Sequence, residues 1–286
     1  MPDGRLLVCA TPIGNLADVT LRVLDALRDA DAIEAEDTRV SRKLLARYQI
    51  ATPLERYDEH TAAQRTPELV ERIAAGATVA LVTDAGTPGV SDPGVRLVDA
   101  CIEAGLPVEV LPGPSAIVTA LVASGLPTHA FFFGGFLPRK AGERRVRLAG
   151  LAALDATLVF FESPRRTAAT LAAIAEALPG RRAAVARELT KVYEEVVRGE
   201  VGELAAALAE RELKGEVVVL IGPPSAKDLA GAPPDREAVR ARIKALTAEG
   251  MSRKDAVRCV ADETGLARNT VYDIAHTRGP EPRPGC

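Results

Sequence analysis

The stretch Asp84-Ala85-Gly86-Thr87-Pro88-Gly89-Val90-Ser91-Asp92-Pro93-Gly94 decides the fold, because it lies between the apolar run Thr78–Thr83 and a helical pattern. Short continuous apolar runs are typical of buried parallel strands. Two more loops rich in proline and glycine have the same setting: Thr11-Pro12-Ile13-Gly14-Asn15 after Leu6–Ala10, and Pro112-Gly113-Pro114-Ser115-Ala116 after Val108–Leu111. In an open α/β sheet the ligand crevice lies at the carboxyl ends of the strands. Three stiff loops there predict an enzyme built around a small bound molecule.

Alternating strand and helix patterns extend well beyond these loops and predict two α/β domains. We expect residues 1–112 to form an N-terminal α/β domain with a parallel sheet, and residues 113–222 a second one with a mixed sheet. Residues 223–235 contain two proline pairs and predict a linker. Residues 236–286 predict a small helical domain with a helix-turn-helix-like join. Within the first domain we expect a basic helix at Thr38–Tyr48 and another helix at Glu68–Ala75.

The 286-residue chain has an ordinary globular composition, with 47% hydrophobic and 26% charged residues. No apolar run approaches the roughly 20 residues that a membrane span needs. The first strand, which begins soon after Met1, is too short for a signal-peptide core. We therefore expect a cytoplasmic protein without membrane contact. The four cysteines and three histidines are scattered, so we expect no metal site.

Several common ligand-binding motifs are missing. No G-x-G-x-x-G follows the first strand and no G-x-x-x-x-G-K-[ST] occurs, which argues against dinucleotides and nucleoside triphosphates. No G-x-S-x-G supports a hydrolase. The prolines in the three loops remove backbone donors that a phosphate cradle needs. The ligand should therefore be recognised by shape and by a few hydrogen bonds.

Lysine and arginine gather in two helical segments although the net charge is only −3. One segment is Thr38–Tyr48, and the other is Lys140–Leu151. Such clusters can follow a phosphate backbone even on a mildly acidic protein. A solvent-exposed helix face has the same composition, so the sequence leaves both interpretations open.

Seven motifs carry a resemblance to a known family. They are Thr11–Asp18, Glu36-Asp37-Thr38-Arg39, Asp84–Gly94, Pro112–Ala116, Phe136-Leu137-Pro138, Glu162-Ser163-Pro164-Arg165-Arg166 and Arg187-Glu188-Leu189-Thr190-Lys191. In this order they resemble the tetrapyrrole-methylase-like (class III) S-adenosylmethionine methyltransferases, over about residues 5 to 222. The last three motifs are similar to those of members that methylate the ribose 2′-oxygen of a decoding-centre cytidine in 16S ribosomal RNA of the small ribosomal subunit.

The resemblance implies a cleft between the two α/β domains that holds S-adenosylmethionine in a folded conformation. The cofactor-binding residues that it implies are Ile13, Gly14, Asp84, Gly86, Thr87, Ser115, Ala116 and Ala186. Gly86 would let the backbone approach closely, and Ser115 at a helix N-terminus could donate to a carboxylate. Asp84 could equally cap a turn, and Ser115 could merely cap its helix.

The resemblance also points to candidates for catalysis and RNA binding. Methyl transfer to a ribose hydroxyl benefits from a base or from a cation near the developing alkoxide. We expect Asp37, Glu188 and Lys191 in this role, unless they form structural ion pairs with one another and with Arg39. The expected RNA-binding residues are Arg39, Arg139, Lys140, Arg144, Arg145 and Arg165.

Three functions are consistent with these sequence patterns. The first is S-adenosylmethionine-dependent methylation of 16S ribosomal RNA by a homodimer, as the resemblance implies. The second is methylation of a tetrapyrrole or corrin precursor with the same fold. The third is a DNA-binding regulator, against which the near-even charge of residues 236–286 argues, so we expect no DNA partner. If that region does bind nucleic acid, Arg268 and Asn269 would be the contacts.

Overall fold

The computed structural model describes residues 4–225, 236–264, 266 and 268–276. The chain divides into two compact units, Met1–Pro224 and Ser225–Cys286. Most of the predicted linker, residues 226–235, lies outside the described residues. In the described part of the chain, no helix is both long and apolar enough to cross a membrane.

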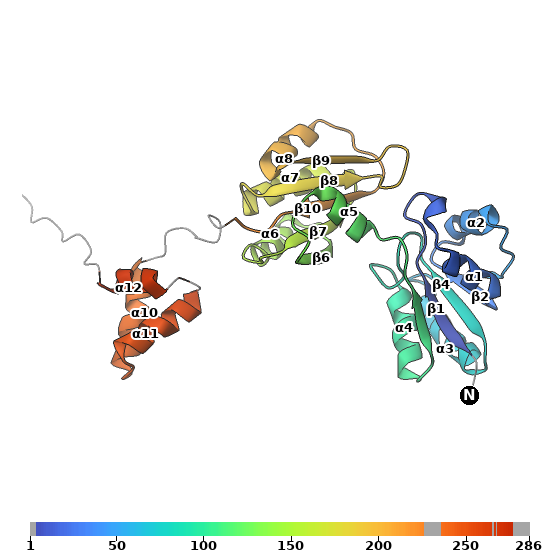
Figure 1. Cartoon of the computed structure of the whole chain (residues 1–286), viewed down its shortest axis with the longest axis horizontal. Coiled ribbons are helices and arrows are strands. Elements are labelled where there is room, and N and C mark those ends of the chain that lie inside the picture. The colour runs from blue at the N-terminus through green and yellow to red at the C-terminus, as the bar shows by residue number, and fades with distance from the viewer. Residues whose placement is uncertain (1–3, 226–235, 265, 267, 277–286) are drawn as a thin grey trace, which may run out of the picture. The chain divides into compact units, whose positions relative to one another are not determined.

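The first unit begins with a five-stranded sheet in which every pairing is parallel (Figure 1). Its strands, in spatial order, are β3 (Leu54–Arg56), β2 (Ala32–Ala35), β4 (Thr78–Val82), β1 (Arg5–Cys9) and β5 (Val108–Leu111). The carboxyl ends of all five therefore meet at one edge. The predicted parallel sheet is confirmed.

Both faces of this sheet are buried, which explains the continuous apolar runs. Along β1, Leu7 and Cys9 point to one apolar core while Leu6 and Val8 point to another. Helices α1 (Leu21–Asp29) and α2 (Thr38–Arg47) pack on the first core. Helices α3 (Ala62–Ala74) and α4 (Gly94–Glu103) pack on the second.

A second sheet follows in the same unit, and it is mixed as predicted. Its order is β6 (Phe131–Phe136), β7 (Thr157–Glu162), β10 (Val217–Ile221), β8 (Arg182–Arg187) and β9 (Glu195–Glu200). Only β6 and β7 are parallel, and the other pairings are antiparallel. Helices α6 (Ala141–Ala149), α7 (Thr167–Ala177) and α8 (Val201–Ala209) cover one face, and α5 (Ala116–Ser124) packs on the other.

The described part of the second unit consists of helices around their own small core. They are α10 (Arg236–Ala248), α11 (Arg253–Thr264) and α12 (Arg268–His276). Val239, Ile243, Val260, Val271 and Ile274 pack together among them. The predicted fold class, two α/β sheets and a C-terminal helical region, is confirmed.

The first unit differs from the predicted elements in two places. Strand β3 at Leu54–Arg56 was not among them, because three residues at a sheet edge leave little apolar pattern. Helix α3 begins at Ala62 rather than Glu68 and contains Pro67. In the turn before this start, the carboxylate of Asp58 accepts hydrogen bonds from the backbone of His60 and Thr61.

Candidate functional site

The loops after β1 and β4 are joined at the carboxyl edge of the first sheet. Thr11 N donates to Gly86 O at 2.8 Å, and Gly86 N donates back to Thr11 O at 3.0 Å. The Thr11 hydroxyl also donates to Thr83 O at 2.9 Å. Gly86 adopts a φ of 85°, which favours glycine. The two loops therefore form one stiff backbone wall.

Ile13 connects this wall to the second sheet through side-chain packing. Its side chain is buried and packs in one apolar cluster with Ala120, Leu189 and Val218. Asn15 N donates to the Thr190 hydroxyl at 3.1 Å, so the same loop also contacts the segment after β8. The β1 loop thus contacts elements of both sheets.

Three cavities adjoin at this junction and form one cleft, which we call the loop cleft. Their volumes are about 410, 360 and 60 Å³. All three share Ala85; the larger two share Ile13, and the smaller two share Ala116 and Phe161. Seven of the eight predicted cofactor-binding residues line it: Ile13, Gly14, Asp84, Gly86, Thr87, Ser115 and Ala116. The eighth, Ala186, is fully buried under the cleft in the cluster around Ile13 and does not line a cavity described here.

An apolar part of the cleft was missed at the residue level. Phe136, Phe161, Pro164 and Val218 line the 360 Å³ cavity. The Phe136 and Phe161 rings meet edge to face at 5.8 Å between centroids. Phe136 and Pro164 belong to two of the seven motifs, but Phe136 ends β6 and Pro164 follows β7, so the sequence does not show that they share a wall with Ile13.

Asp84 brings a half-buried carboxylate into the 410 Å³ cavity. Its Oδ1 accepts from the backbone N of Asp37 at 3.0 Å. Burial, and then the negative charge of Glu36, raise the pKa of Asp84 above its usual value. Glu36 is itself held by the Thr83 hydroxyl, which donates to it at 2.7 Å. The two neighbouring strands β2 and β4 therefore fix the position of Asp84.

Asp37 and Arg39 form a pair at the start of α2. Asp37 caps the helix by accepting from Arg39 N at 2.8 Å, and it also binds the Arg39 guanidinium at 2.6 Å. Hydrogen bonds from Arg39 lower the pKa of Asp37 to about 2. The carboxylate is thus ionised at neutral pH and weakly basic.

Glu188 and Lys191 form a second pair, after β8. Lys191 Nζ lies 2.8 Å from Glu188 Oε1 and 3.1 Å from Glu216 Oε2. The hydrogen bond from Lys191 lowers the pKa of Glu188. The φ of Glu188 is 50°, an unusual value for a non-glycine residue. Of these three residues, Lys191 and Glu216 line the 410 Å³ cavity.

The other predicted residues divide between structural contacts and free surface. Ser115 caps α5, with its hydroxyl 3.5 Å from Val118 N. Arg144 is half-buried and donates to the carbonyls of Pro138 and Arg139 at 3.5 and 3.4 Å. Lys140 pairs with Glu143 at 3.0 Å. Arg139, Arg145 and Arg165 are exposed.

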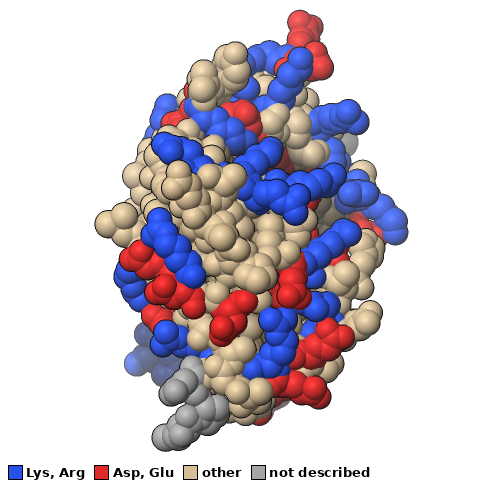
Figure 2. Space-filling model, turned by 90° about the vertical axis from the view of Figure 1, so that its right-hand side faces the viewer, with Lys and Arg blue, Asp and Glu red and all other residues tan. Residues whose placement is uncertain are grey.

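The exposed surface beside α2 is basic. Figure 2 looks onto the side of the first unit that carries α1 and α2. Lysine and arginine prevail across its middle and upper part, with acidic side chains interspersed lower down. Arg39, Arg42, Lys43 and Arg47 are all exposed on α2, and Lys43 also lines the loop cleft. The basic helix therefore borders the cleft.

Comparison with known proteins identifies the family. A family model for Tetrapyrrole (Corrin/Porphyrin) Methylases matches residues 5–205. The chain belongs to this family. A second model, described as the RsmI C-terminal HTH domain, matches residues 233–279, so the tetrapyrrole methylase fold here carries a helical extension.

Two members of this family are similar to the chain over nearly their whole length. The ribosomal RNA small subunit methyltransferase I of Mesorhizobium japonicum is 49% identical over 272 residues, covering 94% of this chain and 90% of that protein. The protein of that name from Mycobacterium bovis is 47% identical over 279 residues, covering 96% and 95%. The resemblance seen in the seven motifs is confirmed.

Solved structures share the fold of the first unit. The methyltransferase CobJ matches with a TM-score of 0.59 and 25% identity, covering 77% of this chain and 94% of that chain. A uroporphyrin-III C-methyl transferase from Thermus thermophilus, complexed with S-adenosyl homocysteine, matches with a TM-score of 0.56 and 20% identity, covering 77% and 97%. At this identity, the second likeness shows a shared fold and no more.

Proposed function

We propose that the protein is an S-adenosylmethionine-dependent methyltransferase that methylates the ribose 2′-oxygen of a cytidine in 16S ribosomal RNA. The observation that carries this proposal is the 49% identity, over 94% of the chain, to a ribosomal RNA small subunit methyltransferase I. The decoding-centre position of the cytidine and the small subunit as substrate rest on the motif resemblance. We further propose that the protein works in the cytoplasm, where that substrate is made.

The loop cleft has the chemistry that this cofactor requires. Ile13, Ala116 and Phe161 offer apolar surface suited to an adenosine, and the Asp84 carboxylate suits an amino group or a ribose hydroxyl. Gly86 and Gly14 keep the wall free of side chains; a Cβ at Gly14 would lie 2.5 Å from Lys191 Cγ. When bound, S-adenosylmethionine supplies an electrophilic methyl group. We assign Ile13, Gly14, Asp84, Gly86, Thr87, Ser115 and Ala116 to hold it, with Ala186 supporting Ile13 from beneath.

The two ion pairs suggest roles for the predicted catalytic residues. The pKa values of Asp37 and Glu188 are both lowered, so neither carboxylate is a strong base at neutral pH. We propose that the hydroxyl proton passes to solvent water as the bond to the methyl group forms, and that Lys191, which faces the cleft, stabilises the developing negative charge on the ribose oxygen. Glu188 and Asp37 then act as positioning residues that fix Lys191 and Arg39. Most of the catalysis would come from holding donor and acceptor in line.

Exposed cations at the start of α2, around α6 and after β7 provide contacts for RNA phosphates. Arg39, Arg139, Arg145 and Arg165 are exposed and suit backbone contacts. Lys140 would exchange its pairing with Glu143 for a phosphate. Arg144, which contacts two carbonyls before α6, would support that segment.

Exposed apolar side chains support the proposed homodimer. Val118 and Val122 project from α5, and Val122 is 69% exposed. Val110 is exposed on β5 and Phe131 on β6, and both strands are at the edges of their sheets. Exposed apolar groups and open strand edges favour association with another chain. We also propose 1–112, 113–222 and 236–286 as the domains, because each sheet is built from one of the first two segments.

Transfer of labelled methyl groups tests this function. The protein is incubated with radiolabelled S-adenosylmethionine and small ribosomal subunits from a strain that lacks the modification. We expect label in RNA that survives alkaline hydrolysis as a ribose-methylated dinucleotide. The fold likeness to tetrapyrrole methylases leaves one alternative, a porphyrin or corrin precursor as acceptor. Label in such a precursor and none in RNA would replace the proposal with that alternative.

A further inference from the structure

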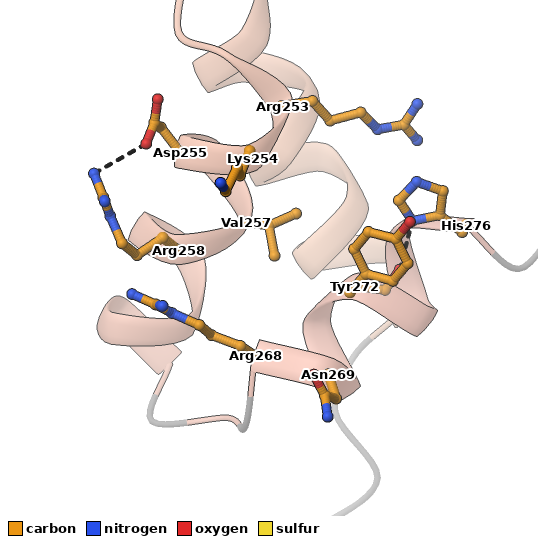
Figure 3. A pocket seen from close by; sticks show the side chains of 9 residues that line it. All are labelled: Arg253, Lys254, Asp255, Val257, Arg258, Arg268, Asn269, Tyr272 and His276. Atoms are coloured by element: carbon orange, nitrogen blue, oxygen red, sulfur yellow. Dashed lines mark hydrogen bonds and ion pairs between the residues drawn. The ribbon is translucent and has the colours of Figure 1, made fainter.

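A cavity of about 470 Å³ opens on the helical unit, between α11 and α12 (Figure 3). We call it the helical cavity. Arg253, Lys254 and Arg258 reach it from α11, and Arg268, Tyr272 and His276 from α12. Buried Val257 lies between these two groups of side chains. The methyl-transfer chemistry proposed above does not use this cavity.

The helical cavity is strongly basic, unlike its unit as a whole. Four lysine and arginine side chains line it, and Asp255 is the only carboxylate among its described lining residues. Asp255 is already engaged, since it binds Arg258 at 3.0 Å and accepts from the Ser252 hydroxyl at 2.6 Å. Among the described residues, neither Lys254 nor Arg268 has a carboxylate within ion-pair distance. A polyanion would find unneutralised positive charge here.

Two cations stand on opposite sides of the cavity (Figure 3). Arg253 crosses from α11 to α12, where its Nη2 donates to Ala275 O at 3.0 Å. Arg268 lies on the other side, beside Arg258. Cations on both sides of one cavity can contact successive phosphates of a chain.

An aromatic platform completes the cavity. Tyr272 and His276 stack with 3.9 Å between ring centroids and 25° between planes. The pair is fixed because a His276 ring nitrogen lies 2.8 Å from Tyr272 O. Tyr272 is nevertheless 54% exposed. An exposed, pre-oriented aromatic ring among cations is the arrangement on which an unpaired base stacks while its phosphates are bound.

We propose that the helical cavity binds a single-stranded RNA segment, with phosphates on Arg253, Lys254 and Arg268 and a base stacked on Tyr272. The proposal rests on the proposed function only in taking RNA, rather than another polyanion, as the ligand. Such a site would anchor the substrate outside the loop cleft and raise the local concentration of the target nucleotide.

Binding of the full-length protein to a fluorescein-labelled, mixed-sequence single-stranded RNA of about 12 nucleotides, within the usual range of such sites, tests this. The variant pair Lys254→Glu/Arg268→Glu should weaken the affinity at least about tenfold and reduce the salt dependence by about 0.7 per lost phosphate contact. The matched control Arg236→Glu/Lys244→Glu makes the same charge change at exposed positions outside the cavity. It should stay within about twofold of the unmodified chain. Equal weakening by both pairs, or by neither, overturns the proposal.

Substitutions of Tyr272 distinguish the contribution of base stacking to RNA binding from that of charge. Tyr272→Ala should weaken binding at least about fivefold, the lower end of the loss of one base–aromatic stack, and Tyr272→Phe should retain the affinity. With 4-thiouridine in the RNA, ultraviolet crosslinking should label the peptide that carries Tyr272. Crosslinks confined to residues 5–222, or a duplex DNA bound more tightly than the single strand, would overturn the proposal.

These outcomes are distinct from failure of the proposed function. Cofactor affinity and methyl transfer by the unmodified chain report on the loop cleft. If RNA binds the helical cavity but no methyl group is transferred, the proposed function fails and this inference stands. If methyl transfer occurs and the Lys254→Glu/Arg268→Glu pair leaves RNA affinity intact, this inference fails and the proposed function stands.

Discussion

The loop cleft and the helical cavity are built in opposite ways. One wall of the loop cleft is formed by backbone, at the Thr11–Gly86 bridge and the glycine at position 86. The helical cavity is formed by long side chains on two regular helices, with Arg253 reaching across to α12. A stiff backbone wall suits one folded small molecule, whereas several cations and an exposed ring suit a flexible polymer. The comparison predicts that changes to one site leave the ligand of the other unaffected.

The largest expected effect is at Asp84. Asp84→Ala removes a half-buried charged hydrogen-bond partner, worth about 1.5–3 kcal/mol, so the affinity for S-adenosylmethionine should fall roughly tenfold to a hundredfold. Titration calorimetry measures it, and Asp99→Ala, at an exposed position on α4, serves as control. Affinity for single-stranded RNA at the helical cavity should not change. An unaltered cofactor affinity would remove Asp84 from the site.

Self-association gives the next effect. Val122→Glu places a charge on an exposed apolar position of α5 and should weaken the homodimer about tenfold or more, because an unpaired charge is costly to bury. Sedimentation equilibrium measures the monomer–dimer balance. Glu176→Lys on α7, a charge change on another helix of the same unit, is the control. A monomeric unmodified chain, or a Val122→Glu variant that pairs equally well, would contradict the homodimer.

A smaller effect tests the backbone wall. A Cβ at Gly113 would lie 2.9 Å from Ala10 Cβ, so Gly113→Ala must push the β5 loop away from β1. We expect a loss of about 1 kcal/mol in the free energy of unfolding, with weaker cofactor binding. Gly142→Ala on α6 meets nothing within 4 Å and should be neutral or stabilising by up to about 1 kcal/mol. Urea unfolding measures the change in the free energy of unfolding for both variants. If Gly113→Ala is as stable as Gly142→Ala, the wall tolerates the added Cβ and the prediction is contradicted.

The smallest effect is the pH dependence of the Asp37–Arg39 pair. The pKa of Asp37 in the folded chain is about 2, below its ordinary value of 3.8. The stabilisation is therefore complete above about pH 3.8 and is lost as the pH falls through 2. Asp37→Asn should lower the urea midpoint at pH 6, and its difference from the unmodified chain should shrink as the pH falls from 4 towards 2. A difference that is constant with pH would mean that the charge of Asp37 does not stabilise the fold.

The backbone-built site was the easier one to predict from sequence. Proline and glycine restrict φ and ψ locally, so the three loops and the strands before them could be recognised without knowing their partners. Seven of eight residues assigned to the loop cleft do line it. Ala186 is instead buried beneath the cleft, and the sequence does not show this because a small residue in a buried strand has the same pattern on either face.

Features that depend on contacts between distant parts of the chain could not be predicted from the sequence. The contact between Lys191, after β8, and Glu216, just before β10, depends on the pairing of these two strands, and no local sequence pattern predicts it. The apolar wall of Phe136, Phe161 and Val218 comes from three strands whose order is not sequential. Of the residues that line the helical cavity, only Arg268 and Asn269 could be named from the sequence as possible nucleic-acid contacts. Its aromatic platform and the crossing of Arg253 depend on how α11 packs against α12.

A crystal structure of the protein with S-adenosyl homocysteine tests the central claim most directly. The account predicts that the ligand lies in the loop cleft, in contact with Ile13, Asp84 and Ala116. Density for the ligand at any other place on the chain, with the loop cleft empty, would contradict it.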